Sequence, residues 1–176
     1  MARRVYFAFH FERDIFRVNV VRNSNVVLGV EEAGFRDQSE YDEVMRKTPE
    51  AIARNLRERM KGTSVTVVLI GRETWQRPWV NWEIQESIAN KNGLLGVYIH
   101  HVSSLGRVES ILPLPTIPTV PATLPFPIMF WDSSDLREFA REVEAAGQRA
   151  DQQRTGDLFR QVMGARLLRN KNWWEP

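Results

Sequence analysis

Short apolar runs alternate with longer amphipathic stretches along this chain. The clearest run is SVTVVLI at residues 64–70, which is rich in β-branched residues and is followed by Gly71, as expected for a central, fully buried strand. Similar short runs predict four further strands. Their separation by helices or long connections predicts an α/β fold with a mostly parallel, five-stranded, flavodoxin-like sheet and helices on both faces. The predicted strands span residues 4–9, 26–30, 64–70, 94–99 and 128–131.

The stretches between these runs carry helix start and stop signals. Thr48 followed by Pro49 predicts a capped helix, and Gly62 is expected to end it. Less regular patterns predict, in chain order, a turn over residues 10–14, a helix over 15–22 and a long polar connection over 31–47.

The C-terminal third departs from this alternation. Residues 103–127 contain six prolines after Leu112 and predict an extended connection, which would serve as a spacer or as a partner-recognition segment. We expect one domain over residues 1–132, including this connection, and a C-terminal helical extension over 133–176 packed on the same domain. The extension is predicted to contain a helix capped by Ser133 or Ser134, a polar break over 147–156 and a final helix opened by Asp157.

Residues 74–92 are expected to form one helix with two faces of different composition. Pro78 suits the first helical turn and Gly93 supplies a stop. One face is apolar and predicted to be core, whereas the other joins a tryptophan to two carboxylates and an amide. That second face fits either a binding site or a surface helix whose tryptophan covers the core edge. At 100° per residue, the apolar face holds Val80, Ile84, Ser87 and Ile88, and the second face holds Trp79, Glu83, Glu86 and Asn90.

Three motifs in this order resemble a known family. The W-V-x-W-E sequence at residues 79–83 resembles the carboxylate-bearing helix of TIR and TIR-like domains. FAFHFERD at 7–14 and VRNSNVV at 21–27 resemble the opening of the TIR-like proteins of Thoeris anti-phage defence systems. The resemblance implies a TIR-like three-layer sandwich. It also implies cleavage of the nicotinamide–ribose bond of NAD and formation of a cyclic ADP-ribose-type signal.

The resemblance assigns the catalytic role to Glu83, whose carboxylate would hold the ribose hydroxyls and stabilise developing positive charge. Nicotinamide leaves from a cationic pyridinium as a neutral molecule, so one carboxylate could suffice without a general acid. Glu86 is the less favoured substitute. Ligands bind beyond the carboxyl ends of parallel strands, where we expect substrate contacts from Phe9, His10, Phe11, Arg13, Arg36, Asp37 and Trp79.

Several of these residues also have structural interpretations. Arg13 and Arg17 carry planar forks suited to phosphate, but Arg17 fits a solvated helix charge as well. His10 fits a buried structural histidine equally. Arg36 and Asp37 belong to a loop that, in TIR domains, both borders the nucleotide and mediates assembly.

Composition narrows the function classes. With 176 residues, 43% hydrophobic and 26% charged, the chain has ordinary globular composition, and a net charge of +2 gives little support for nucleic-acid binding. The absence of cysteine excludes disulfides and thiol nucleophiles, and three histidines make a metal site unfavourable. Neither a signal peptide nor a membrane span is visible, so we expect a cytoplasmic enzyme that uses NAD as substrate and needs no cofactor.

Two alternatives remain open on these residues. A TIR-like assembly or interaction module without chemistry would use the same helices and loop. A flavodoxin-like nucleotide-binding module would use the same sheet, but the chain has no glycine-rich phosphate loop after its first strand. The enzyme hypothesis adds self-association through TIR-like surfaces and a phage-derived trigger as partners.

Overall fold

A parallel sheet forms the centre of the protein. The computed structural model describes residues 3–24, 32–33, 35, 38–102, 118 and 124–170, and most of their side chains up to residue 157. Within these residues the sheet has five strands in the order β2-β1-β3-β4-β5, and all four pairings are parallel. The predicted α/β fold with a parallel five-stranded sheet is confirmed. The strands are β1 (Val5–Ala8), β2 (Glu32–Ala33), β3 (Val65–Ile70), β4 (Gly93–Tyr98) and β5 (Ile128–Phe130).

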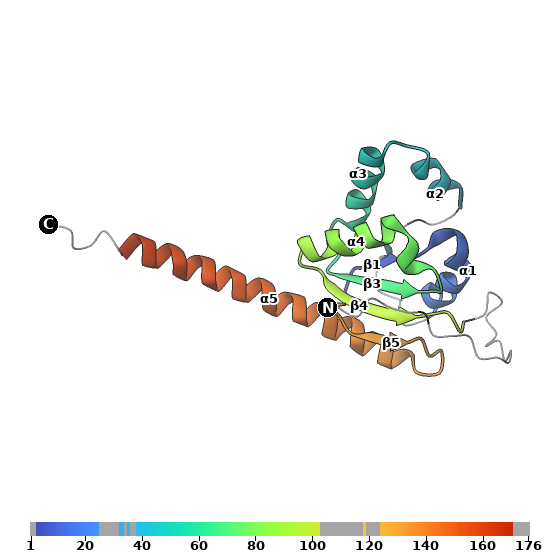
Figure 1. Ribbon diagram of the computed structural model, residues 1–176. Helices are drawn as coiled ribbons and strands as arrows, with labels where there is room; N and C mark the ends of the chain where they lie inside the picture. The colour runs from blue at the N-terminus through green and yellow to red at the C-terminus, as the bar shows by residue number, and fades with distance from the viewer. Residues whose placement is uncertain are drawn as a thin grey trace.

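Helices cover both faces of the sheet (Figure 1). Alternate residues of each strand point to opposite faces, and in this protein they enter two separate cores. Val5 and Phe7 of β1 pack in the core that includes residues of α1 and α5, whereas Tyr6 and Ala8 pack in the core of α4. Tyr6 therefore faces α4. The helices are α1 (Phe11–Arg22), α2 (Gln38–Met45), α3 (Pro49–Met60), the short 3₁₀ turn η2 (Thr74–Gln76), α4 (Pro78–Ala89) and α5 (Leu136–Asn170).

The order of β1 and β3 fixes where a ligand site can form. The two strands are neighbours, but the chain leaves β1 towards β2 and leaves β3 towards β4. In doubly wound sheets such a reversal opens a crevice beyond the carboxyl ends of the strands. The segment after β1 and the start of α4 meet there.

The first helix begins earlier than the sequence suggested. α1 starts at Phe11, so the predicted turn over residues 10–14 and the helix start at residue 15 are wrong. Phe11, Val18 and Val21 are buried, and this packing outweighs the low helix propensity of β-branched residues.

The connection between α1 and α3 also contains more structure than predicted. The expected polar connection over residues 31–47 holds β2 and α2, because Tyr41, Val44 and Met45 give α2 an apolar side that packs on the core. The predicted strand over 26–30 lies outside the described residues.

Helix α3 confirms its predicted start, with the Thr48 hydroxyl accepting a hydrogen bond from the Ala51 amide at 3.4 Å. Pro78 opens α4 as predicted, and Val80, Ile84 and Ser87 are buried. The single helix predicted from residue 74 is wrong, because residues 74–76 form the separate 3₁₀ turn η2. Ile88 is 49% exposed, so its assignment to the core face is wrong.

The predicted stop of α4 at Gly93 is wrong as well. The helix ends at Ala89, Lys91 adopts the left-handed backbone conformation with φ 54°, and Gly93 already begins β4. Gly93 is required for another reason: a Cβ there would lie 2.3 Å from the Ala146 carbonyl of α5.

The C-terminal helix is continuous. α5 runs through residues 147–156, where a polar break was predicted, and its start is capped by Asp135, whose carboxylate accepts from the Glu138 amide at 3.0 Å, rather than by Ser133 or Ser134. Arg3 holds the middle of α5 through ion pairs with Glu144 and Asp151. Beyond this point α5 extends away from the sheet (Figure 1). Apart from residues 118 and 124–127, the predicted proline-rich connection lies outside the described residues.

None of the helices in the described parts of the chain has the length and apolar character needed to cross a bilayer.

Candidate active site

A pocket opens between the end of β1, α2 and the start of α4. Its volume is about 90 Å³, well below the roughly 300–1,000 Å³ of sites that enclose a whole small molecule. In this state it can hold only part of a nucleotide-sized ligand. The lining comprises Tyr6, Phe7, Phe9, His10, Phe11, Phe35, Tyr41, Met45, Arg77, Pro78, Trp79, Val80 and Glu83.

Glu83 is the only carboxylate among these lining residues. It is 6% exposed, and its Oε1 accepts a hydrogen bond from the Tyr6 hydroxyl. Burial raises the pKa of Glu83 to about 8, against the opposing effect of the Tyr6 hydrogen bond. At neutral pH the unliganded pocket therefore favours the protonated acid.

Tyr6 belongs to the site, although the sequence analysis did not single it out. Burial, together with the nearby charge of Glu83, raises the pKa of Tyr6 well above its usual value, so the phenol remains a donor. The signal was present in the alternation of β1, which places Tyr6 on the α4 side of the sheet.

Backbone and hydroxyl contacts hold the turn of α4 that carries Glu83. The Ser87 hydroxyl donates to the Glu83 carbonyl at 2.7 Å and lies 2.8 Å from the Thr66 hydroxyl. Thr66 is in register with Tyr6 on the neighbouring strand. The carboxylate and its phenol partner are therefore both anchored on the sheet.

Aromatic rings form one wall of the pocket. Phe11 stacks on Tyr41 with ring centroids 4.5 Å apart and lies 5.6 Å from Phe9. On the α4 side, half-buried Trp79 makes an edge contact with Trp82 at 5.9 Å. Phe9, Phe11 and Trp79, which the sequence suggested as substrate contacts, all line the pocket.

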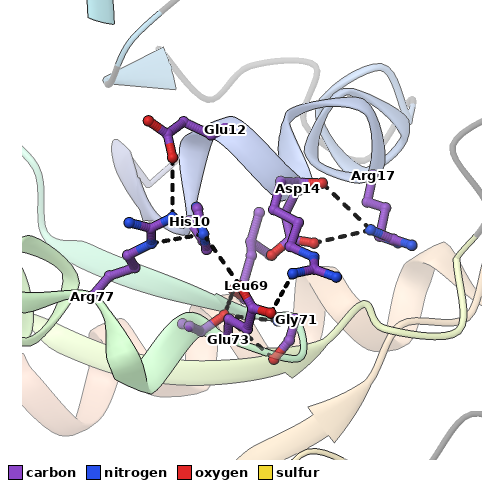
Figure 2. A network of polar contacts seen from close by, with 10 residues as sticks. His10, Glu12, Asp14, Arg17, Leu69, Gly71, Glu73 and Arg77 are labelled. Atoms are coloured by element: carbon purple, nitrogen blue, oxygen red, sulfur yellow. Dashed lines mark hydrogen bonds and ion pairs between the residues drawn. The ribbon is translucent and has the colours of Figure 1, made fainter.

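A polar network borders the same pocket (Figure 2). Arg77 donates from Nε to His10 Nε2 at 2.7 Å and from Nη2 to Glu12 at 3.0 Å. His10 is 3% exposed, and burial, followed by the charge of Arg77, lowers its pKa. His10 is thus a neutral acceptor that lines the pocket. Arg77 was not predicted as a site residue.

The two arginines predicted to contact phosphate lie elsewhere. Arg13 forms an ion pair with Glu73 and is not among the pocket-lining residues. Arg17 donates to the Val102 carbonyl at 2.7 Å and to Asp14 at 3.1 Å. Burial raises the pKa of Asp14, and Gly71 leaves room for its carboxylate (Figure 2). Arg36 and Asp37 lie outside the described residues.

Glu86, the alternative carboxylate, forms an ion pair outside the pocket. Its two oxygens accept from Arg57 of α3 at 2.9 and 3.1 Å, and the Arg57 guanidinium also lies over the Trp82 ring at 5.1 Å. Glu86 is not a lining residue of the pocket.

Comparison with known proteins places the chain in a family with this fold. The model of the TIR-like domain of the Thoeris protein ThsB matches residues 6–104, more than half of the chain, so the chain belongs to that family. A similar protein is the "Putative cyclic ADP-D-ribose synthase ThsB1" of Bacillus cereus (strain MSX-D12). The two are 40% identical over 118 residues, which are 65% of this chain and 62% of the relative. The chain thus spans less than two thirds of that relative's length.

Proposed function

We propose that this protein cleaves the bond between nicotinamide and ribose in NAD, with Glu83 as the catalytic carboxylate. The observation that carries the proposal is a buried glutamate, hydrogen-bonded to Tyr6, in an aromatic pocket at the strand-order reversal of the sheet. Family membership and the name of the relative, "Putative cyclic ADP-D-ribose synthase ThsB1", support the same chemistry. NAD is the substrate, and no resident cofactor is invoked.

The reaction requires stabilisation of positive charge rather than protonation of a leaving group. The C1′–N bond breaks, its electron pair goes to the nicotinamide nitrogen, and the pyridinium becomes neutral. The ribose carbon becomes oxocarbenium-like, and a carboxylate beside it stabilises this charge. Capture by water gives ADP-ribose and a proton, whereas capture by an adenine nitrogen gives a cyclic ADP-ribose-type product.

The raised pKa of Glu83, about 8, couples this chemistry to substrate binding. A cationic nicotinamide riboside unit entering the pocket offsets the cost of burying a negative charge. Binding of the substrate therefore promotes loss of the Glu83 proton. Glu83 is therefore ionised when a bound substrate supplies a positive charge, and it is a neutral carboxylic acid when the pocket is empty.

The test is nicotinamide release and product analysis with purified protein, alone and with extract from phage-infected cells as trigger. We expect Glu83→Gln to lower turnover about 100- to 1,000-fold, as for the loss of a transition-state charge stabiliser. Glu86→Gln is the matched control on the same helix and should stay within about threefold, because its partner Arg57 lies outside the pocket.

Retention of full turnover by Glu83→Gln under triggered conditions would remove this residue from the mechanism. Equal losses in both variants would indicate general damage to α4. Self-association and the identity of a phage-derived trigger are further parts of the proposal, and size in solution with and without infected-cell extract tests them.

A further inference from the structure

The pocket contains a positively charged group that the proposed bond cleavage does not use. Arg77 is the only arginine or lysine among the lining residues. We propose that Arg77, oriented by His10, binds a phosphate of the dinucleotide. This inference rests on the NAD-cleaving function proposed above. The site would then select pyridine nucleotides, which carry a 5′-phosphate, over the unphosphorylated nucleoside.

The guanidinium of Arg77 is oriented but not fully engaged. Nε is fixed by His10 and Nη2 by Glu12. Within the described residues, Nη1 has no hydrogen-bond partner, and the side chain is 43% exposed. The planar fork can therefore donate to an anion from Nη1 without giving up His10, and Glu12, on the exposed side, can yield Nη2 as well.

His10 acts as the support for this arginine. It is buried and accepts at Nε2, so its proton must be on Nδ1, since a neutral imidazole has one donor and one acceptor nitrogen. An imidazolium could not accept this bond. Glu73 Oε2 lies 3.8 Å from the same nitrogen (Figure 2), and Arg13 binds the other oxygen of Glu73. His10 is a positioning residue that determines the direction of the guanidinium plane.

The other arginines near the end of β1 are held by other groups. Arg13 is paired with Glu73, and Arg17 is tied to Asp14 and to the Val102 carbonyl. Neither lines the pocket. Phosphate recognition, which the sequence suggested for these two residues, is better served by Arg77.

The spacing along α4 suits one nucleotide. Arg77 precedes the helix and Glu83 follows six residues later, about 9 Å at 1.5 Å per residue. Both side chains reach the same pocket. A ribose held near Glu83 would thus direct its 5′-phosphate towards the start of the helix and Arg77.

The experiment compares binding of NAD and of nicotinamide riboside, which lacks phosphate, to the full chain and its variants by calorimetry. Arg77→Gln should weaken NAD binding about 10- to 100-fold, the range expected for a hydrogen bond to a charged group. Nicotinamide riboside binding should stay within about threefold. Glu12→Gln removes the negative charge that competes with a phosphate for the same guanidinium, so NAD binding should stay equal or become tighter.

The role of His10 is tested by the same comparison of NAD and nicotinamide riboside binding. His10→Ala should lose part of the preference for NAD over the riboside, and His10→Gln, which keeps an acceptor, should restore it. Equal weakening of both ligands in Arg77→Gln, or unchanged NAD binding, would overturn the proposal. The proposal would also be overturned if Glu12→Gln lost as much affinity for NAD as Arg77→Gln, or if the wild-type chain showed no measurable NAD binding. Arg77-dependent NAD binding without nicotinamide release under triggered conditions would leave this inference standing and refute the NAD-cleaving function.

Discussion

Two carboxylates of α4 lie three residues apart and have opposite environments. Glu83 is buried, contacts the phenol of Tyr6 and lines the pocket. Glu86 is bound through both oxygens by Arg57 on the neighbouring helix. The same residue type thus serves as a buried acid in the pocket and as an ion-pair partner of α3.

The difference shows that neighbouring elements give different environments to two residues that occupy similar positions on the helix. On a helical projection both carboxylates belong to one polar face. Tyr6 projects from β1 towards one of them, and Arg57 projects from α3 towards the other. Tertiary neighbours, not the position on the helix, decide which carboxylate is buried in the pocket and which forms an ion pair.

The largest expected effect concerns stability as a function of pH. The pKa of Glu83 in the folded protein is about 8, above its ordinary value of 4.5, so between these values the folded state binds one more proton than the unfolded state. Stability from this group is therefore full below about pH 4.5 and is lost as pH rises towards 8. Glu83→Gln removes this dependence. The free energy of unfolding of the variant, relative to that of wild type, should therefore rise by at most about 4 kcal/mol from pH 5 to pH 8, at about 1.36 kcal/mol per pH unit.

Denaturant unfolding of both proteins at several pH values measures this, because all other titrating groups cancel in the difference. Glu86→Gln is the control and should show no comparable growth. A difference between wild type and Glu83→Gln that is constant from pH 5 to pH 8 would show that Glu83 ionises as an ordinary surface carboxylate.

Tyr6→Phe should have the next largest effect. The variant removes the hydrogen bond that lowers the pKa of Glu83, and the loss of a bond to a buried polar group costs about 1–3 kcal/mol. The pKa of Glu83 should move further upward, so turnover should fall at neutral pH and partly recover at higher pH.

The pH profile of nicotinamide release, measured beside the free energy of unfolding, checks both effects. Tyr98→Phe is a suitable control, since Tyr98 packs against Phe130 outside the pocket. An unchanged profile in Tyr6→Phe would mean that the phenol contributes packing but does not tune the carboxylate.

The sequence predicted the parallel sheet and the start of α4 for clear physical reasons, whereas the assignment of Glu83 came from the family resemblance. The β-branched run that became β3 had few alternatives to a buried strand, and Pro78 marked the start of α4. Where signals were weak, packing decided. Residues 10–14 looked like a turn, but Phe11 is buried in the core and α1 already begins there. The polar stretch after Gly147 stays helical in α5, whose preceding turns are anchored by Arg3 and packed against Gly93.

The site was predicted in part, because contacts between distant segments have no local signal. Five of the eight residues expected at the site line one pocket, namely Phe9, His10, Phe11, Trp79 and Glu83. Arg13 was a plausible phosphate ligand by residue type, but Glu73, which is remote in the sequence, pairs with it. Tyr6 and Arg77 gain their importance only when β1 and α4 come together.

The smallest expected effect separates a binding wall from packing at Trp79. Trp79 is half-buried, lines the pocket and touches Trp82 by an edge contact. We expect its ring to exclude water beside Glu83 and so to strengthen the electrostatics there. Trp79→Ala should therefore lower NAD turnover at least about tenfold, or about 1.4 kcal/mol of transition-state stabilisation. Because the Trp79 side chain is only partly buried, Trp79→Ala should lower the free energy of unfolding by less than the roughly 3–5 kcal/mol expected for a fully buried tryptophan.

Trp82→Ala supplies the matched comparison, because Trp82 packs against the same core and lies outside the pocket lining. It should lose stability while turnover per folded molecule stays near wild type. Thermal unfolding and turnover are measured on the same samples. If Trp79→Ala instead lost melting temperature and kept its specific activity, Trp79 would be a packing residue like Trp82. The distinction between the pocket side of α4 and its Arg57 side would then rest on Glu83 alone.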